Sequence, residues 1–181
     1  MPEKLLLHAC CAPCGIVVMD ELRRQFDLSI LFFNPNIYPE AEYLKRKKEV
    51  VRLATEWHIP MLDHDFLPET WEHATKGFEN EPEGGARCGI CFRHRLFYTA
   101  EIAKKNNFDI FASTLTSGRN KVAERINAIG EAGAARFGVN FLAENWKKNG
   151  RQERSRAMIT ERGIYRQDYC GCKYSLQKKR A

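Results

Sequence analysis

The sequence predicts an α/β fold in which a mostly parallel sheet is covered by helices. Two observations carry this prediction: short apolar segments alternate with longer segments of helical spacing, and polar turns separate the two kinds. Such alternation is typical of βαβ units with right-handed crossovers. With 181 residues, of which 44% are hydrophobic and 29% charged, the chain is long enough for one globular core.

The first half of the chain contains three expected strands. The segments KLLLH, LSILFF and IPML are short and apolar, and the turn Asn34-Pro35-Asn36 ends the second of them. Between them, apolar side chains recur at helical spacing, as at Tyr43, Val50 and Leu53. The expected elements are strands at residues 4–8, 28–33 and 59–62 and helices at residues 13–26 and 39–58.

The second half repeats this alternation after a loop of low hydrophobicity, ENEPEGGA. The segments DIFASTL and VNFLA are expected strands, and the longer segments around them have helical spacing. A short basic helix then precedes the terminal YCGCKYS. The expected elements are the loop at residues 79–86, strands at 109–115 and 139–143, and helices at 88–106, 121–137 and 152–162.

Positive charge is concentrated at the C-terminal end. Residues 1–150 hold 20 basic and 20 acidic residues, whereas residues 151–181 hold 9 basic and 3 acidic residues, which gives the net charge of +6. A basic segment on a balanced domain indicates a polyanionic partner, with nucleic acid the first candidate. A solvated tail that keeps the protein soluble explains the same charge.

All seven cysteines fall into three groups. Cys10, Cys11 and Cys14 follow the first expected strand, Cys88 and Cys91 form a C-x-x-C pair, and the third group is Cys170-Gly171-Cys172. In open parallel sheets, ligands bind outside the carboxyl ends of the strands, which is where the first group falls. Clustering of every cysteine argues against inert buried thiols and favours metal binding or redox chemistry.

The number of thiols favours iron–sulfur chemistry over structural zinc. A zinc site takes four ligands and leaves three of these cysteines unexplained, whereas a four-thiolate cluster beside a second thiol site uses them all. A disulfide between Cys170 and Cys172 would close a very small ring and be easily reduced. The pair is therefore either redox-active or a source of two ligands to a second metal.

The motifs HACCAPC, FFNPNIYPEAEYLKR, RCGICFRHRL, ASTL and IYRQDYCGCKYS occur in this order in the QueH-type epoxyqueuosine reductases. The resemblance extends over nearly the whole chain. It implies a Rossmann-like sheet of the adenine-nucleotide alpha-hydrolase (HUP-like) type with a basic, cysteine-containing C-terminal segment. It also implies reduction of epoxyqueuosine to queuosine at the wobble position of a tRNA, without cobalamin, as the last step of queuosine biosynthesis.

The same resemblance implies a 4Fe-4S cluster held by Cys10, Cys11, Cys88 and Cys91. It makes Cys170 and Cys172 a catalytic redox pair or ligands that help to hold a second, mononuclear iron. Some relatives have Asp where this chain has Cys14, so Cys14 is a further metal-ligand candidate. Two departures from the family pattern, Ser117-Gly118-Arg119 and the segment at residues 144–147, lie after the fourth and fifth expected strands.

A tRNA substrate directs attention to the basic C-terminal segment and to aromatic side chains. Splayed anticodon bases often stack on aromatic rings, for which Trp71, Trp146, Phe78 and Tyr38 are candidates. Phosphate contacts should weaken tRNA binding as the salt concentration rises. The expected phosphate contacts are Arg151, Arg154, Arg156, Arg162 and Arg166.

Removing an epoxide oxygen takes two electrons and two protons, so a proton donor and a second redox centre are needed. His8, Tyr38, Asp65 and Tyr169 lie at strand or motif ends, but a hydrogen-bonded core role is the better interpretation of His8. None of the four is assigned as the acid.

We expect one catalytic domain over residues 1–181, in which residues 151–181 complete the active site. The alternative functions are an ATP-dependent tRNA sulfur-transfer enzyme and a zinc-stabilised RNA-binding module; no glycine-rich phosphate loop follows the first expected strand, which argues against the first. No apolar segment is long enough for a membrane span, and the N-terminus lacks a signal peptide's apolar stretch. A cytoplasmic monomer that receives electrons from a separate donor is therefore expected.

Overall fold

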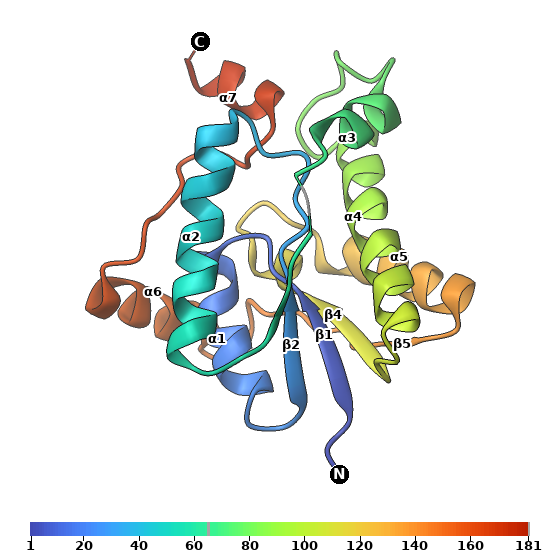
Figure 1. Cartoon of the computed structure of the whole chain (residues 1–181). Coiled ribbons are helices and arrows are strands. Elements are labelled where there is room, and N and C mark those ends of the chain that lie inside the picture. Colours follow the sequence, from blue (N-terminus) through green and yellow to red (C-terminus); the bar gives the residue numbers. More distant parts are fainter. Residues whose placement is uncertain (65, 181) are drawn as a thin grey trace.

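The computed structural model describes residues 1–64 and 66–180, apart from the side chain of residue 180. A five-stranded parallel sheet with strand order β3-β2-β1-β4-β5 forms its centre (Figure 1). From the central strand β1 the chain first adds β2 and β3 on one side and then returns to add β4 and β5 on the other side. The topological switch point therefore lies between β1 and β4. The strands are β1 (Lys4–His8), β2 (Asp27–Leu31), β3 (Met61–Leu62), β4 (Ile110–Ser113) and β5 (Asn140–Phe141).

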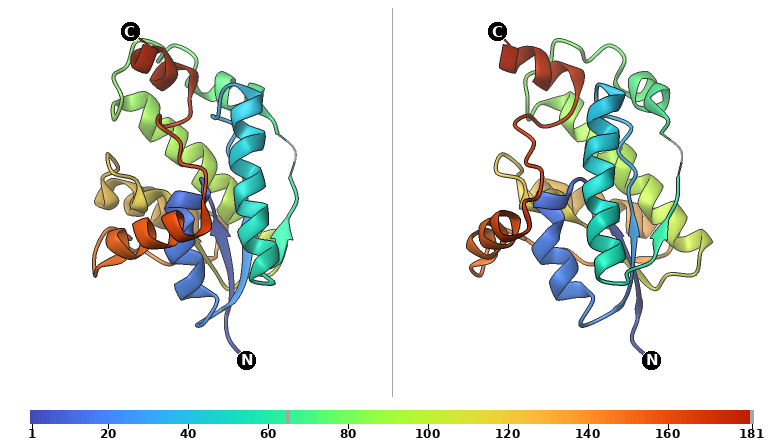
Figure 2. Two further views of the ribbon diagram at one scale, coloured as in Figure 1. Left: turned by 90° about the vertical axis from the view of Figure 1, so that its left-hand side faces the viewer. Right: turned by 60° about the vertical axis from the view of Figure 1, so that its left-hand side comes forward.

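Helices cover both faces of this sheet. In Figure 1, α1, α2 and α6 lie to the left of the strands, and α4 and α5 lie to the right. The views in Figure 2 show α6 beside α1, at the edge of the helical layer that α1 and α2 form. The helices are α1 (Ala12–Leu22), α2 (Glu40–Glu56), α3 (Pro68–Thr75), α4 (Ala86–Lys105), α5 (Ala123–Phe137), α6 (Arg151–Arg162) and α7 (Lys173–Arg180), with one 3-10 turn, η1 (Thr114–Ser117).

The hydrophobic core is divided between the two faces because successive side chains of a strand point to opposite sides. Leu5 and Leu7 of β1 pack in the cluster formed with α1 and α2. Leu6 and, on β4, Phe111 pack in the cluster formed with α4 and α5. The predicted parallel α/β fold is thereby confirmed, as is the expectation that the apolar run KLLLH is a buried strand.

The elements that the sequence did not predict are short. The eight-residue helix α3 buries only Trp71 and Thr75, and α7 consists mostly of polar residues, so neither has a clear apolar period. The last two strands are shorter than predicted. Only Asn140 and Phe141 pair with β4, and the chain after Ser113 turns into η1 instead of extending the strand.

The chain ends in two helices that pack far apart. Helix α6 lies against α1. Helix α7 lies beyond the carboxyl edge of the sheet, near the N-terminal start of α2 and the loop before α4 (Figures 1 and 2). In the described part of the chain, no helix is both long and apolar enough to cross a membrane. The cytoplasmic location stays a prediction.

A candidate thiol-lined active site

The first cysteine group lies where β1 passes into α1, at the switch point of the sheet. The Cys11 Sγ caps α1 by accepting a hydrogen bond from the Cys14 backbone N–H at 3.4 Å. Thr114, just after β4, receives a hydrogen bond from the Cys10 backbone N–H and donates one to the Cys10 Sγ at 3.2 Å. The Sγ atoms of Cys10, Cys11 and Cys14 all lie within 4.8 Å of one another, a spacing at which three thiols can hold a metal ion.

The pKa values of these three thiols are shifted in different directions. Hydrogen bonds from Cys11 and Cys14 hold the pKa of Cys10 well below its usual range. Burial raises the pKa of Cys11, and the hydrogen bond to Cys10 raises that of Cys14. The group therefore favours one thiolate on Cys10, and a thiolate is the form that binds metals. The side chain of Gln167 donates a further hydrogen bond to the Cys11 Sγ at 2.8 Å.

The second cysteine group lies in the first turns of α4, which begins after Gly85. The Cys88 Sγ accepts a hydrogen bond from the Gly84 backbone N–H at 3.2 Å. Cys91 is buried, which raises its pKa, and Arg95 follows it one turn later on the same face of the helix. Arg95 donates a hydrogen bond to the Asn34 side chain at 3.1 Å, and Asn34 in turn donates to the carbonyl of Ala9, just before Cys10.

The third cysteine group is held against α2 by its own backbone. The buried guanidinium of Arg46 donates to the carbonyls of Cys170 at 3.0 Å and Tyr169 at 3.2 Å, while Glu42 pairs with its Nε. The backbone N–H of Tyr38 donates to the Gly171 carbonyl at 2.8 Å. Gly171 has φ +136°, and a Cβ there would lie 3.0 Å from the Arg46 guanidinium, so only glycine suits this position.

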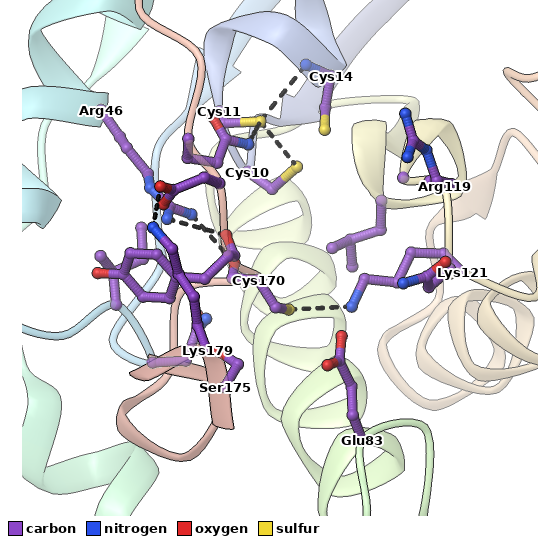
Figure 3. Close-up of a pocket in the computed structure, with 18 of the residues that line it drawn as sticks. Cys10, Cys11, Cys14, Arg46, Glu83, Arg119, Lys121, Cys170, Ser175 and Lys179 are labelled. Carbon is purple, nitrogen blue, oxygen red and sulfur yellow. Dashed lines mark hydrogen bonds and ion pairs between the residues drawn. The ribbon is translucent and has the colours of Figure 1, made fainter. Parts of the chain in front are cut away.

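The three groups meet at one edge of the sheet. A cavity of about 540 Å³ is lined by Cys10, Cys11, Cys14 and Cys170 (Figure 3). A neighbouring cavity of about 480 Å³ is lined by Cys88, Cys170 and Cys172. Cys170 therefore borders both cavities, and all seven cysteines are free thiols.

Two cations lie among the sulfurs, and the described residues include no carboxylate that forms an ion pair with either of them. Lys121 donates a hydrogen bond to the Cys170 Sγ at 3.0 Å, as Figure 3 shows. Burial opposes its charge, but the charge on Cys170 outweighs burial and raises the pKa of Lys121. Arg95 is buried, its Nε has no hydrogen-bond partner, and among the described residues no carboxylate pairs with it. A buried cation in this position requires negative charge nearby, which thiolates supply.

Three of the five arginines expected to bind RNA form ion pairs within the protein. Arg151 and Arg154 form ion pairs with Glu21 of α1 at 2.9 and 2.6 Å, and Arg162 pairs with Glu56 of α2. Arg156 and Arg166 are exposed, and the described residues include no ion-pair partner for either. RNA contact by these five arginines stays a prediction.

The four aromatic residues expected to stack on an anticodon base differ in burial. Trp71 and Trp146 are 3% and 4% exposed, so the interpretation that they stack on a base is wrong. Trp146 instead donates to the Ser113 carbonyl at 2.9 Å. Tyr38 and Phe78 are exposed and remain candidates.

The candidate proton donors mostly have structural partners. His8 is fully buried between the Ser113 hydroxyl and the Phe33 carbonyl, each 3.0 Å away, and burial lowers its pKa to about 4. It is the hydrogen-bonded core histidine that the sequence favoured. Tyr169 donates to the Tyr38 carbonyl, and burial raises its pKa to about 12. Asp65 lies outside the described residues.

The sequence reasoning missed the cations that line the cavity. They are widely separated in the chain. Arg46 and Arg95 lie in the motifs FFNPNIYPEAEYLKR and RCGICFRHRL, and Arg119 lies in the departure Ser117-Gly118-Arg119, but a motif does not show which groups a cation faces in the folded chain. The cavity-lining cations are Arg46, Arg95, Arg119, Lys121, Lys178 and Lys179.

Comparison with known proteins gives a consistent result. A family model described as "Epoxyqueuosine reductase QueH" matches residues 5–178. Proteins named epoxyqueuosine reductase QueH from Acinetobacter baylyi and Thermotoga maritima are 44% and 34% identical to the chain. Each match covers 97% of this chain, and 81% and 92% of the respective relative.

Solved structures of other families share the fold. The U34-tRNA thiolase NcsA from Methanococcus maripaludis with its 4Fe-4S cluster has a TM-score of 0.59 at 14% identity; the match covers 96% of this chain and 61% of the thiolase. A predicted subunit of a tRNA methyltransferase from Methanocaldococcus jannaschii has a TM-score of 0.55 at 10% identity, covering 87% of this chain and 76% of that one. These likenesses confirm the HUP-like sheet and carry no further conclusion.

Proposed function

The chain belongs to the epoxyqueuosine reductase QueH family and is an oxidoreductase of queuosine biosynthesis, and on that premise we propose how its thiol-lined cavity performs the reaction. The substrate is epoxyqueuosine at the wobble position of a tRNA, and the base enters the cavity at the carboxyl edge of the sheet. One observation carries this proposal. Cysteines from three distant parts of the chain converge on that cavity and its neighbour.

The donor set fits an iron–sulfur cluster. Thiolates are the usual cluster ligands, and the buried Arg95 and Lys121 offset their negative charge. Cys10, Cys11, Cys88 and Cys91 would hold the 4Fe-4S cluster, and the cluster would supply electrons one at a time. The Sγ of Cys14 lies within 4.8 Å of those of Cys10 and Cys11, so Cys14 would be a further metal ligand at this site. Backbone and threonine hydrogen bonds to the Cys10 and Cys88 sulfurs orient these thiols before any metal is bound.

Cys170 and Cys172 are proposed to act as the redox pair. Reduction of the epoxide to an alkene takes two electrons and two protons, and the oxygen leaves as water. Oxidation of two thiols to a disulfide releases two electrons and two protons, so the step balances. Cys170 borders both cavities and Cys172 only the neighbouring one, which makes Cys170 the sulfur nearer the substrate.

Lys121 is proposed to position Cys170. Its ammonium group donates a hydrogen bond to the Cys170 Sγ at 3.0 Å, which holds the sulfur at the border of the two cavities. Lys121 follows the segment Ser117-Gly118-Arg119, in which this chain departs from the family pattern. That segment lines the cavity through Gly118 and Arg119, so the departure lies at the proposed site.

We propose that tRNA phosphates lie across the mouth of the cavity. Arg119, Lys178 and Lys179 line it, and the first two have no ion-pair partner among the described residues. Arg156 and Arg166, which are exposed on α6 and the segment after it, are the second set of candidates. Neither alternative function, an ATP-dependent sulfur-transfer enzyme or a zinc-stabilised RNA-binding module, is better supported.

The test is anaerobic purification followed by iron and sulfide analysis, a visible spectrum and turnover of tRNA carrying epoxyqueuosine. We expect at least four irons per chain with matching sulfide and formation of queuosine. The Cys88→Ala variant should lose both the absorbance and turnover, whereas Cys172→Ala should keep the absorbance and lose turnover. A colourless zinc protein without turnover, even after anaerobic reconstitution, would overturn the proposal.

A further inference from the structure

Helix α4 has two opposite faces with different chemistry. At 3.6 residues per turn, Cys88, Cys91 and Arg95 project to the side of the thiol-lined cavities. Ile90 and Phe97 project to the opposite side of the helix. The two faces are therefore separated by the width of a single helix, about 10 Å.

The opposite face of α4 forms an apolar groove with α5. Gly89, Ile90 and Phe97 line it on the α4 side, and Ile129 does so on the α5 side. Gly89 and Ile90 are the two residues of the C-x-x-C pair that are not cysteines. In Figure 1, α4 and α5 form the right-hand side of the molecule, whereas α1, α2 and α6 lie on the left.

The rim of this groove is positively charged. Arg93 lies over the Phe97 ring, 4.5 Å from its centroid, and is exposed. Arg125 lies directly over Gly89 and donates hydrogen bonds to the carbonyls of Gly84 and Gly85. Neither arginine forms an ion pair within the described residues, and no acidic residue lines the groove.

We propose that this groove docks an acidic one-electron carrier protein of the flavodoxin or ferredoxin type. The inference rests on the proposed function, because epoxide reduction consumes two electrons and two protons per turnover. In the proposed step these come from Cys170 and Cys172, which become a disulfide while the epoxide oxygen leaves as water. Two reduced carrier molecules then each give up one electron, and these electrons with two protons from water return the disulfide to two thiols for the next turnover. A carrier bound in the groove lies on the side of α4 opposite to the thiol-lined cavities and close to the Cys88–Cys91 segment. The tRNA occupies the cavity mouth on the other side of the helix.

The charges around the groove favour an acidic carrier over a second copy of the chain as its occupant. A second copy of the chain on a two-fold axis would bring like-charged arginines together, which is unfavourable. In the proposed function the tRNA occupies the cavity side of Cys88, so the Arg93–Arg125 side of α4 is the cationic surface left for an acidic carrier. Electron-transfer complexes are typically small, and electrostatic attraction sets their association rates.

The test measures binding of oxidised flavodoxin, and separately of a ferredoxin, to the anaerobically prepared protein at low and high salt. We expect binding that weakens as salt rises, and about tenfold weaker binding for Arg93→Glu. The matched control is Lys48→Glu, the same charge reversal at an exposed position on α2, and it should bind as the unmodified protein does. Failure of both carriers to bind, or equal loss in both variants, overturns the proposal.

Turnover distinguishes this docking from the proposed function. With dithionite as reductant, which needs no docking, Arg93→Glu should turn over epoxyqueuosine tRNA at the unmodified rate; with reduced flavodoxin it should be at least tenfold slower. If the unmodified protein fails with dithionite, the proposed function fails, whereas the binding measurement still decides the docking. If Arg93→Glu instead weakens binding of tRNA about tenfold, the groove belongs to the RNA and the docking proposal is overturned.

Discussion

At the scale of single residues, Lys121 is the neighbour that most affects Cys170. A hydrogen bond from a charged donor contributes about 1.5–3 kcal/mol, and here the Lys121 ammonium group is the donor to the Cys170 Sγ. Nothing in the sequence links two residues so far apart. The contact exists only because η1 and the segment before α7 both end at the carboxyl edge of the sheet.

Replacing Lys121 by methionine keeps the length of the side chain and removes its charge. We expect Cys170 to be alkylated about tenfold more slowly by iodoacetamide in the metal-free protein at neutral pH, because its sulfur loses the cationic hydrogen-bond donor that lies 3.0 Å away. Peptide mapping by mass spectrometry measures the rate at each cysteine. Modification of Cys172 should be unchanged, and so should Cys170 in the control Lys178→Met. An unchanged rate at Cys170 in the Lys121 variant would contradict the assigned role.

Gly171 is the second residue whose identity is set by its surroundings. Its φ of +136° is rarely adopted by other residues, and a methyl group would contact Arg46. We expect Gly171→Ala to lower the free energy of unfolding by about 1–3 kcal/mol and to abolish turnover, since Cys170 and Cys172 would move. Urea denaturation and the turnover assay measure the two effects.

Gly163 provides the control for this substitution. It also has a positive φ, +58°, but a methyl group added there would have no neighbour within 4 Å. Gly163→Ala should therefore lose about 1 kcal/mol of stability and keep its turnover. Equal turnover in the two variants would show that the position of the YCGC segment does not depend on Gly171.

At the scale of elements, the basic helix α6 is attached to α1 by charge. Asp20 and Glu21 of α1 pair with Arg154, and Glu21 also pairs with Arg151. Burial disfavours the charged form of Asp20, but hydrogen bonds from Arg23 and Arg24 outweigh it and hold its pKa below the usual range. The charge pattern that suggested an RNA-binding surface thus serves partly to pack the helix.

The lowered pKa of Asp20 predicts a pH-dependent stability. A carboxylate whose pKa falls on folding stabilises the protein above its unfolded pKa, about 3.9, and this stabilisation is lost as the pH falls through the folded value. Asp20→Asn should therefore unfold at a lower urea concentration than the unmodified protein at pH 7, and the difference should shrink toward pH 3. Glu131→Gln, an exposed position on α5, should show no difference at either pH; a constant gap for Asp20→Asn would refute the electrostatic explanation.

At the scale of the whole molecule, two basic surfaces compete for the tRNA backbone. One is the cavity mouth with Arg119, Lys178 and Lys179, and the other is the outer side of α6 and the segment after it. Each phosphate contact contributes about 0.7–0.9 to the slope of the logarithm of the binding constant against the logarithm of salt concentration. The slopes of single variants therefore separate phosphate contacts from structural arginines.

We expect Arg119→Ala and Lys178→Ala each to reduce that slope by about one contact. Arg151→Ala should leave the slope unchanged and lower the stability instead, because this residue pairs with Glu21 and Glu144. Filter binding of unmodified tRNA at several salt concentrations measures the slopes. A reduced slope for Arg151→Ala, with none for Arg119→Ala, would place the RNA on α6.

The sequence by itself determined the kind of fold and the grouping of the cysteines. Apolar runs such as KLLLH and the helical spacing between them are local patterns, and a parallel sheet then places the ends of β1 and β4 at one edge. The three cysteine groups were visible for the same reason, since a motif is a local feature of the chain. Predicted boundaries were inaccurate at several ends: the helix expected at residues 13–26 ends at Leu22, and only Asn140 and Phe141 of the expected strand at 139–143 pair with β4, because pairing with a neighbour decides how far a strand extends.

Only the tertiary structure decided which charges surround the thiols. Lys121, Arg95 and Arg46 come from different elements, and their roles depend on which carbonyl, sulfur or carboxylate lies opposite them in the folded chain. The same holds for Arg151 and Arg154, which the sequence assigned to RNA and which the structure pairs with Glu21. Packing brings these groups together across long stretches of sequence, and an electrostatic interaction depends on distance in space rather than on separation along the chain.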